Sequence, residues 1–305
     1  MSLSLKQIND KLVKKIYIPD DDTRPVKGYD ICQEVYSNIF LCARKKSGKT
    51  CALFKIIKEC AVKDTVIIVF CSTIYKDKNW IQIRKYFEKK GMDIRVYTSI
   101  YEDGEDQLST LIHDLSAEAK EKEEIKDEDE TQEEPSSADR CDDILQRLAS
   151  MHLQTNSFPA AESDEKEKKK KVKKCKYQAP EYIIIFDDLS SELKSSSLLR
   201  LMKFNRHFKT KLIISSQWLH DLLPESRKQL DLFLIFKGFP LKKCELIYRD
   251  CDSAIPFEIF YKIYKKATKK PFSFMYIDTR SDSFRCNFNQ EFIIHSKEDD
   301  NDSET

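Results

Sequence analysis

The amino-acid sequence predicts an α/β fold in which helices cover both faces of a mostly parallel central sheet. Short runs that are apolar throughout and rich in β-branched residues, such as Thr65–Phe70, are typical of strands buried on both faces. Segments with apolar residues at helical spacing, such as Trp80–Lys90, alternate with these runs along the chain. Strands that alternate with helices form parallel sheets, whose ligands bind outside the carboxyl ends of the strands.

The individual elements follow from the same two patterns. Apolar runs mark most of the strands, and Ile94–Thr98 has the alternation of a half-buried strand. In chain order, the expected strands are Ile39–Leu41, Thr65–Phe70, Ile94–Thr98, Tyr182–Phe186, Lys211–Ser216 and Leu232–Phe236. The expected helices contain Leu53–Ile57, Trp80–Lys90, Leu108–Leu115, Leu193–Met202 and Ile255–Lys266, and Phe272–Ile277 with Phe284–Phe288 forms a terminal hairpin or edge pair.

The loop between the first strand and the first helix has the sequence of a phosphate-binding loop, Ala-Arg-Lys-Lys-Ser-Gly-Lys-Thr. Gly48 permits the backbone conformation of the cradle, Lys49 can reach the β- and γ-phosphates, and the Thr50 hydroxyl can bind Mg²⁺. Ala43 replaces the usual first glycine. The alternative is a chance match in a lysine-rich helix start, which the total of only 5 glycines disfavours. The predicted nucleotide-binding residues are Ala43, Arg44, Lys45, Lys46, Ser47, Gly48, Lys49, Thr50 and Cys51.

Polar residues at the ends of two later strands complete the predicted site. Asp187 and Asp188 follow a buried strand, where Asp187 can hold Mg²⁺ through water and Asp188 can orient or deprotonate the attacking water. Gln217 follows the strand Lys211–Ser216, and its amide can hydrogen-bond the γ-phosphate or that water. An ordinary cap or loop residue explains Gln217 equally well. We therefore expect Gly48, Asp187 and Gln217 to converge at one edge of the sheet.

Composition and charge limit the class of protein. A chain of 305 residues with 40% hydrophobic content can bury a sizeable core, and its formal charge of +1 indicates no particular partner. The sequence has no apolar run of membrane-span length, and its N-terminus lacks the apolar segment of a secretory signal. The 10 cysteines include no Cys-x-x-Cys pair, which predicts reduced, mostly buried thiols in a cytosol or nucleus.

Blocks of charge interrupt the predicted domain. Residues 116–176 include the acidic stretch Glu118–Glu134 and the lysine run Lys166–Lys176, a composition that predicts a disordered insertion. The lysine run could bind nucleic acid or act as a nuclear-import signal, but we favour a solvated charge block. We therefore divide the chain into an N-terminal flank (1–36), one P-loop domain (37–115 and 177–292), the insertion (116–176) and an acidic tail (293–305).

The motifs together resemble a known family. The phosphate loop, Ile-Ile-Ile-Phe-Asp-Asp-Leu and Leu-Ile-Ile-Ser-Ser-Gln are similar to the DNA-packaging ATPases of large DNA viruses, virophages and Maverick-type transposons, which belong to the FtsK–HerA superfamily. The segment from Phe272 to Asp278 also resembles the end of the poxvirus-type packaging proteins. The resemblance covers most of the chain outside the flank and the insertion, which is not part of the family's core. Asp188 stands where related motors often carry glutamate.

This resemblance implies a P-loop NTPase three-layer sandwich with an additional strand between the two nucleotide-binding strands and with C-terminal edge strands. Gln217 would end that additional strand as the γ-phosphate sensor. The resemblance also implies a homo-oligomeric ring, a hexamer, in which an arginine of one subunit acts on the γ-phosphate of the nucleotide bound to the neighbouring subunit. Arg227 matches the family's position best and Arg206 is the second candidate, while a surface salt bridge is the alternative for either.

The expected function is therefore Mg²⁺-dependent ATP hydrolysis that moves double-stranded DNA, with ATP and Mg²⁺ as cofactors and a viral or virus-like genome as cargo. DNA and a capsid or portal protein are the expected partners, without a membrane. The expected location is the host cytoplasm (viral factory), the nucleus or the virion. Two rivals remain, a P-loop kinase for a small molecule, which would need an arginine-rich lid, and a non-catalytic nucleotide switch. Intact Lys49, Thr50, Asp187 and Asp188 disfavour the switch.

Overall fold

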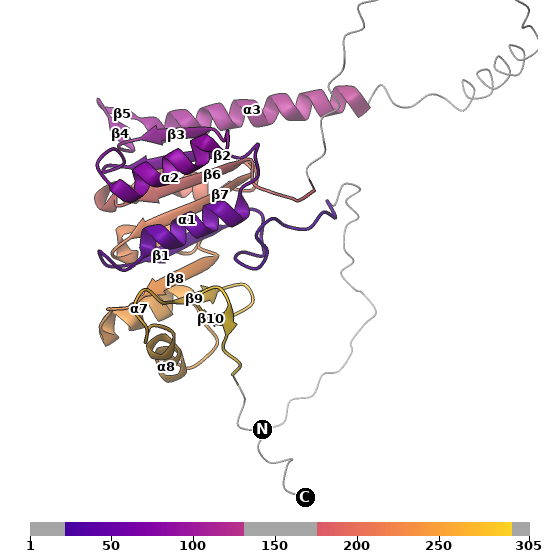
Figure 1. Ribbon diagram of the computed structural model, residues 1–305. Helices are drawn as coiled ribbons and strands as arrows, with labels where there is room; N and C mark the ends of the chain where they lie inside the picture. The colour runs from indigo at the N-terminus through magenta and orange to yellow at the C-terminus, as the bar shows by residue number, and fades with distance from the viewer. Residues whose placement is uncertain (1–21, 131–175, 295–305) are drawn as a thin grey trace, which may run out of the picture.

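The computed structural model describes residues 22–130 and 176–294, and it confirms the predicted layered α/β architecture (Figure 1). Within these residues, nine strands form one sheet in the order β11-β10-β9-β8-β1-β7-β6-β2-β3. The strands of the sheet are β1 (Asn38–Cys42), β2 (Val66–Cys71), β3 (Ile94–Tyr97), β6 (Tyr182–Asp187), β7 (Thr210–Ser216), β8 (Leu232–Phe236), β9 (Phe274–Asp278), β10 (Ser283–Cys286) and β11 (Gln290–Glu291). A separate small hairpin consists of β4 (Tyr101–Glu102) and β5 (Glu105–Asp106).

The strand order confirms the additional strand. The strands from β8 to β3 are parallel, and β7 lies between β1, which leads into the phosphate loop, and β6, which ends in Asp187. On the other side of β1, β8 pairs with β9 in antiparallel fashion, and the predicted terminal hairpin is formed by β9 and β10. Because β1, β6 and β7 run in the same direction, their carboxyl ends lie together at one edge.

Helices cover both faces, and each face has its own apolar core. Apolar side chains that alternate along the strands pack against α1 and α2 on one face and against α3, α5, α7 and α8 on the other. Figure 1 shows α1 and α2 side by side across the sheet. The α-helices are α1 (Lys49–Cys60), α2 (Lys78–Lys89), α3 (Gln107–Glu130), α5 (Ser196–Lys203), α6 (Pro224–Arg227), α7 (Leu241–Cys251) and α8 (Phe257–Ala267), and the 3₁₀ helices are η1 (Ser190–Lys194) and η2 (Leu219–Asp221).

The expectation of disorder from residue 116 is wrong for residues 116–130, because α3 continues through them to Glu130. Leu111 and Leu115 are buried, and the residues that follow on the same side of the helix find polar partners. Tyr182 donates a hydrogen bond to Glu118, and Lys122 lies 2.6 Å from Glu181. The helix therefore extends the domain beyond the predicted boundary at residue 115.

Two further elements differ from prediction. The segment Leu193–Met202 is divided into η1 and α5, because the Ser195 side chain accepts a hydrogen bond from the backbone N–H of Leu198 and starts a new helix. The sequence reasoning also missed α7. Most of the insertion (131–175) with most of its lysine run, most of the flank (1–21) and most of the tail (295–305) lie outside the described residues. Within the described residues, no helix combines the length and apolar character needed to cross a bilayer.

Candidate active site

The phosphate loop joins β1 to α1 at the carboxyl edge of the sheet. Gly48 immediately precedes α1 and has φ 93°, a left-handed conformation that glycine adopts without strain. Lys46 also has a positive φ of 61°, so the chain turns sharply twice before the helix begins. The first turn of α1 leaves backbone N–H groups without partners within the helix, and these point towards an anion placed in the loop. The loop therefore has the backbone arrangement that an anion cradle requires.

Asp187 lies at the end of β6 and is held rigidly. The residue is 3% exposed, and its Oδ2 atom accepts a hydrogen bond of 2.9 Å from Nε1 of Trp80 on α2. Its Oδ1 atom is buried without a hydrogen bond from the described residues, and Lys49 Nζ lies 2.9 Å away as an ion-pair partner. One oxygen is thus fixed by the protein, and the other faces the phosphate loop.

Lys49 connects the loop to both carboxylates. Its ammonium is 2.9 Å from Asp187 and also donates a hydrogen bond to Asp188. Burial by itself lowers the pKa of Lys49, but the negative charge of Asp187 and the hydrogen bond to Asp188 outweigh this effect and raise the pKa. Lys49 therefore stays charged at neutral pH, as a residue that binds phosphate oxygens must.

Asp188 enters the same cleft because the chain turns after β6. Side chains alternate along a strand, so Asp188 would point to the opposite face from Asp187 if the strand continued. Instead Asp188 has φ 55°, and its N–H donates to the carbonyl of Ser215 at 3.3 Å. This left-handed turn brings the Asp188 carboxylate to Lys49, where it is 36% exposed and open to water.

Gln217 follows β7 and is exposed at the cleft. The turn that carries it is anchored, because Ser216 Oγ donates to the Asp221 carboxylate and Ala43 N–H donates to the Ser216 carbonyl at 3.0 Å. The predicted convergence of Gly48, Asp187 and Gln217 therefore follows from the adjacent parallel ends of β1, β6 and β7.

Lys49, Asp188 and Gln217 line a cleft of about 320 Å³. Sequence reasoning missed two of its residues, Asp77 and Asn79, which begin α2 after β2. The Asp77 side chain caps this helix by accepting a 2.8 Å hydrogen bond from the Asn79 N–H. The cleft is lined by Arg44, Lys45, Lys46, Ser47, Gly48, Lys49, Thr50, Cys51, Asp77, Asn79, Asp188 and Gln217.

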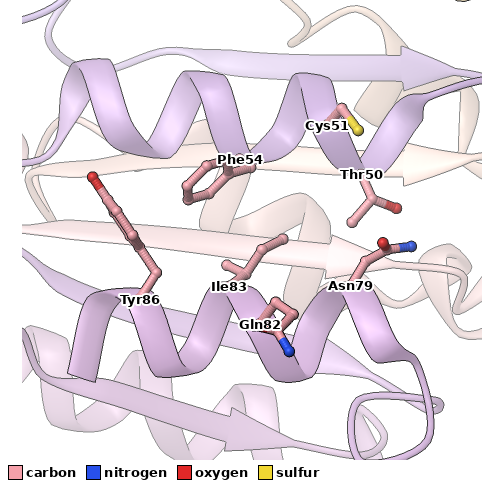
Figure 2. A pocket seen from close by; sticks show the side chains of 7 residues that line it. All are labelled: Thr50, Cys51, Phe54, Asn79, Gln82, Ile83 and Tyr86. Carbon is pink, nitrogen blue, oxygen red and sulfur yellow. The ribbon is translucent and has the colours of Figure 1, made fainter. Parts of the chain in front are cut away.

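A second, more apolar pocket of about 380 Å³ opens beside the cleft, between α1 and α2. Figure 2 shows Thr50 and Asn79 facing each other at one end of this pocket and Tyr86 at the other. Phe54 and Ile83 lie between these ends and supply its apolar walls. The pocket shares Thr50, Cys51 and Asn79 with the cleft, so the two are continuous.

No family model matches this chain, and no curated protein matches it. Among solved structures, it is similar to the genome packaging NTPase B204 from Sulfolobus turreted icosahedral virus 2 in complex with AMPPCP, with 16% identity, coverage of 83% of this chain and 97% of that chain, and a TM-score of 0.47. It is also similar to the cytoplasmic domain of the Thermomonospora curvata Type VII secretion ATPase EccC, with 12% identity, coverage of 79% and 24%, and a TM-score of 0.36. The site is assigned from its own geometry.

The residues present fit a magnesium ion. Mg²⁺ prefers oxygen ligands. The cleft offers the Thr50 hydroxyl, and the Asp187 Oδ1 atom is buried at the end of β6 with Lys49 Nζ 2.9 Å away as its ion-pair partner. Trp80 holds the other carboxylate oxygen, which fixes the orientation of Asp187. Thr50 and Asp187 would thus hold the ion, and bound Mg²⁺ would neutralise charge on the phosphates.

The two candidate arginines lie outside this cleft. Arg227, on α6, is 13% exposed, and its Nε atom lies 3.3 Å from the Asp250 carboxylate of α7. Arg206 is exposed in the turn before β7, at the edge of the sheet opposite the cleft. Neither side chain lines the chain's own phosphate cleft. A catalytic role for either one therefore requires the cleft of another subunit.

Proposed function

We propose that this protein is a Mg²⁺-dependent ATPase that couples hydrolysis to the movement of double-stranded DNA, packaging a viral or virus-like genome into a capsid. One observation carries the proposal: Lys49, Asp188 and Gln217 meet in a single cleft at the ends of β1, β6 and β7, with β7 between the other two strands. This arrangement provides a phosphate-binding lysine, a carboxylate open to water and an amide beside the same position.

The proposed roles follow from these positions. The loop amides and Lys49 bind the phosphates and orient the nucleotide in the cleft. Asp188, partly exposed and fixed by the turn after β6, accepts a proton from the attacking water or orients it. Gln217 hydrogen-bonds the γ-phosphate or that water and thereby senses whether the nucleotide has been hydrolysed.

The full proposal places this site in a homo-oligomeric ring, a hexamer, around DNA, with Arg227 or Arg206 acting across the subunit interface. Light scattering in the presence of a non-hydrolysable ATP analogue tests the ring, and a monomer under all conditions would contradict it. The proposed location is the viral factory in the host cytoplasm or the nucleus, with a capsid or portal protein as partner. Fractionation of producing cells and purified particles tests this location.

The deciding experiment is steady-state ATP hydrolysis with and without long double-stranded DNA. We expect DNA to stimulate the parental protein. Asp188→Asn removes the water-activating carboxylate but leaves the loop intact, so it should preserve nucleotide binding and lower turnover at least about a hundredfold. Lys49→Ala should weaken nucleotide binding itself. An Asp188→Asn variant that hydrolyses ATP at the parental rate would contradict the role of Asp188, and nucleotide binding without any hydrolysis would favour the switch.

The apolar pocket between α1 and α2 favours a second candidate, a P-loop kinase for a small molecule. The pocket begins at Thr50 and Asn79, on the metal side of the cleft, where an acceptor hydroxyl would approach the γ-phosphate. Hydrolysis that is indifferent to DNA, together with ATP consumption that depends on an added metabolite, would support this candidate. Hydrolysis stimulated by DNA and unchanged by metabolites would exclude it.

A further inference from the structure

Phe272, just before β9, is a large apolar residue in an unfavourable position. It is 69% exposed, and its backbone has φ 62°. A bulky residue with positive φ is rare and strained, and such strain is concentrated at ligand-binding sites. The nearby rings of Phe274 and Phe288 pair with each other at 5.0 Å, whereas the Phe272 ring has no aromatic partner within the described residues. Contact with a neighbouring aromatic ring therefore does not account for its conformation.

The surrounding turn holds Phe272 in place. The backbone N–H and the side-chain hydroxyl of Ser273 donate to the Lys270 carbonyl at 3.4 and 2.7 Å. On the other side of the ring, Phe274 begins β9 and its N–H donates to the Asn287 side chain at 3.2 Å. These contacts fix the backbone on both sides of Phe272, so the exposed ring is attached to a rigid segment of backbone.

The ring lies against the phosphate loop. A β-carbon placed on Gly48 would be 3.3 Å from Phe272 Cδ1 and 3.4 Å from Phe272 Cβ. The absence of a side chain at Gly48 thus leaves room for this ring, in addition to allowing the turn of the loop. A nucleotide held by the loop amides therefore has an exposed aromatic ring within reach.

The direction of the nucleotide places its base on this side. Asp187, Asp188 and Gln217 lie at the ends of β6 and β7, on one side of β1, and they mark the γ-phosphate end. On the other side of β1 lie β8 and β9, as Figure 1 shows, and Phe272 directly precedes β9. A nucleotide that lies along this edge of the sheet, with its terminal phosphate beside the carboxylates, extends its base towards β8 and β9.

The pocket between α1 and α2 is the other apolar surface near the loop, but it lies at the wrong end for the base. It begins at Thr50, one of the two residues that would hold the metal at the terminal phosphates. Its aromatic rings are also already paired, since Phe54 and Tyr86 meet edge to face at 5.0 Å. Phe272 offers a free ring face instead.

We propose that Phe272 is the platform on which the purine base of the bound nucleoside triphosphate stacks. The inference rests on the proposed function, because it requires a nucleotide in the phosphate loop. Every base can stack on an aromatic ring, whatever hydrogen-bonding groups its edge carries. The platform therefore contributes to the affinity for the nucleotide but does not discriminate between adenine and guanine. A strained, exposed ring is then explained by the ligand that covers it.

Calorimetry on the full-length protein with Mg²⁺ tests this by comparing a non-hydrolysable ATP analogue with inorganic tripolyphosphate, which has no base. Phe272→Gly should weaken binding of the analogue about tenfold and leave tripolyphosphate binding unchanged. Because glycine tolerates φ 62°, this variant should unfold at the parental temperature or above. Phe272→Trp should retain affinity, and the analogue should quench its additional fluorescence. Tyr29→Ala, which removes another exposed ring, is the matched control.

Three outcomes overturn the proposal. If Phe272→Gly binds the analogue as tightly as the parental protein, the platform is wrong while the proposed function stands. If Gln82→Tyr, which fills the pocket between α1 and α2, weakens binding of the analogue but not of tripolyphosphate, the base lies in that pocket. If the parental protein binds neither probe, the proposed function fails together with the platform.

Discussion

Arg227 is held by an ion pair within its own chain. Its side chain is 13% exposed and lies 3.3 Å from Asp250, whose other carboxylate oxygen is 3.2 Å from His220 Nε2. An arginine that stabilises a neighbour's γ-phosphate has to exchange such a partner for the phosphate when the subunits meet. The ion pair with Asp250 is compatible with this role because it holds the charged guanidinium of Arg227 in one orientation near the surface.

A subunit-mixing experiment tests whether Arg227 acts across the interface. Arg227→Ala and Lys49→Ala should each be nearly inactive alone. In the proposed ring, a mixture of the two contains some sites with an intact Lys49 facing an intact Arg227. Hydrolysis should therefore recover partly on mixing. The control is a mixture of Lys49→Ala with Asp188→Asn, which should remain inactive because both residues belong to the same subunit's site. Equal inactivity of both mixtures would assign Arg227 a role within its own subunit.

The residues that the sequence alone located share one property: each lies in a linear motif or directly after an apolar strand. Asp187, Asp188 and Gln217 were found in this way, because adjacent parallel strands bring their carboxyl ends together. Trp80 and Phe272 were not assigned any role. The position of Trp80 depends on how α2 packs on the sheet, and that of Phe272 depends on where β9 pairs with β8. The local sequence pattern predicts neither of these arrangements.

At the level of elements, α2 supports the predicted metal site. The helix begins at the carboxyl end of β2, next to the cleft, and Trp80 in its first turn donates to Asp187. Trp80 is 1% exposed, so its indole is packed between the helix and the sheet. Such a partner behind a metal-binding carboxylate fixes the orientation of the carboxylate, and here it leaves the other oxygen facing Lys49.

We predict that Trp80→Phe raises the Mg²⁺ concentration needed for ATP hydrolysis while the protein remains folded. Phenylalanine keeps most of the packing but leaves Asp187 Oδ2 without its donor, which should cost about 1–3 kcal/mol of stability. The Mg²⁺ concentration for half-maximal ATP hydrolysis should rise about tenfold or more. Phe87→Leu, on the same helix and also buried, should lower stability without changing the Mg²⁺ requirement. An equal Mg²⁺ requirement in both variants would contradict the orienting role.

The strands were easier to predict than the helices. Central strands such as Ile39–Leu41 are apolar throughout because the sheet is covered on both faces, and that pattern is hard to mistake. In contrast, the buried residues of α7 are Cys244, Ile247 and Cys251. Their spacing is helical, but two of the three are cysteines, so the apolar pattern is difficult to recognise in the sequence. The end of α3 was missed because its stabilising partners, Tyr182 and Glu181, lie at the start of β6 and directly before it, far away in the sequence.

Across the whole molecule, the sheet is assembled from two parts of the chain on either side of residues 131–175, and every central strand is buried. Many of the cysteines take part in this core. Cys42, Cys60, Cys71, Cys244 and Cys251 are buried and free, whereas Cys51 is exposed at the phosphate cleft. Most of the described cysteines are buried, as predicted, and this burial has a consequence for stability at high pH.

Burial raises the pKa of Cys60 and of Cys244 to about 11 each, and it raises the pKa of Cys251 well above its ordinary value. Above pH 9 the unfolded chain loses thiol protons that the folded chain keeps, so the unfolded state binds fewer protons and stability falls as pH rises. One such thiol contributes at most about 3 kcal/mol. Urea unfolding under reducing conditions should therefore give a lower free energy of unfolding at pH 10 than at pH 8. Cys60→Ala should show a shallower decline, whereas a parental stability that is constant or rises over this interval would contradict the argument.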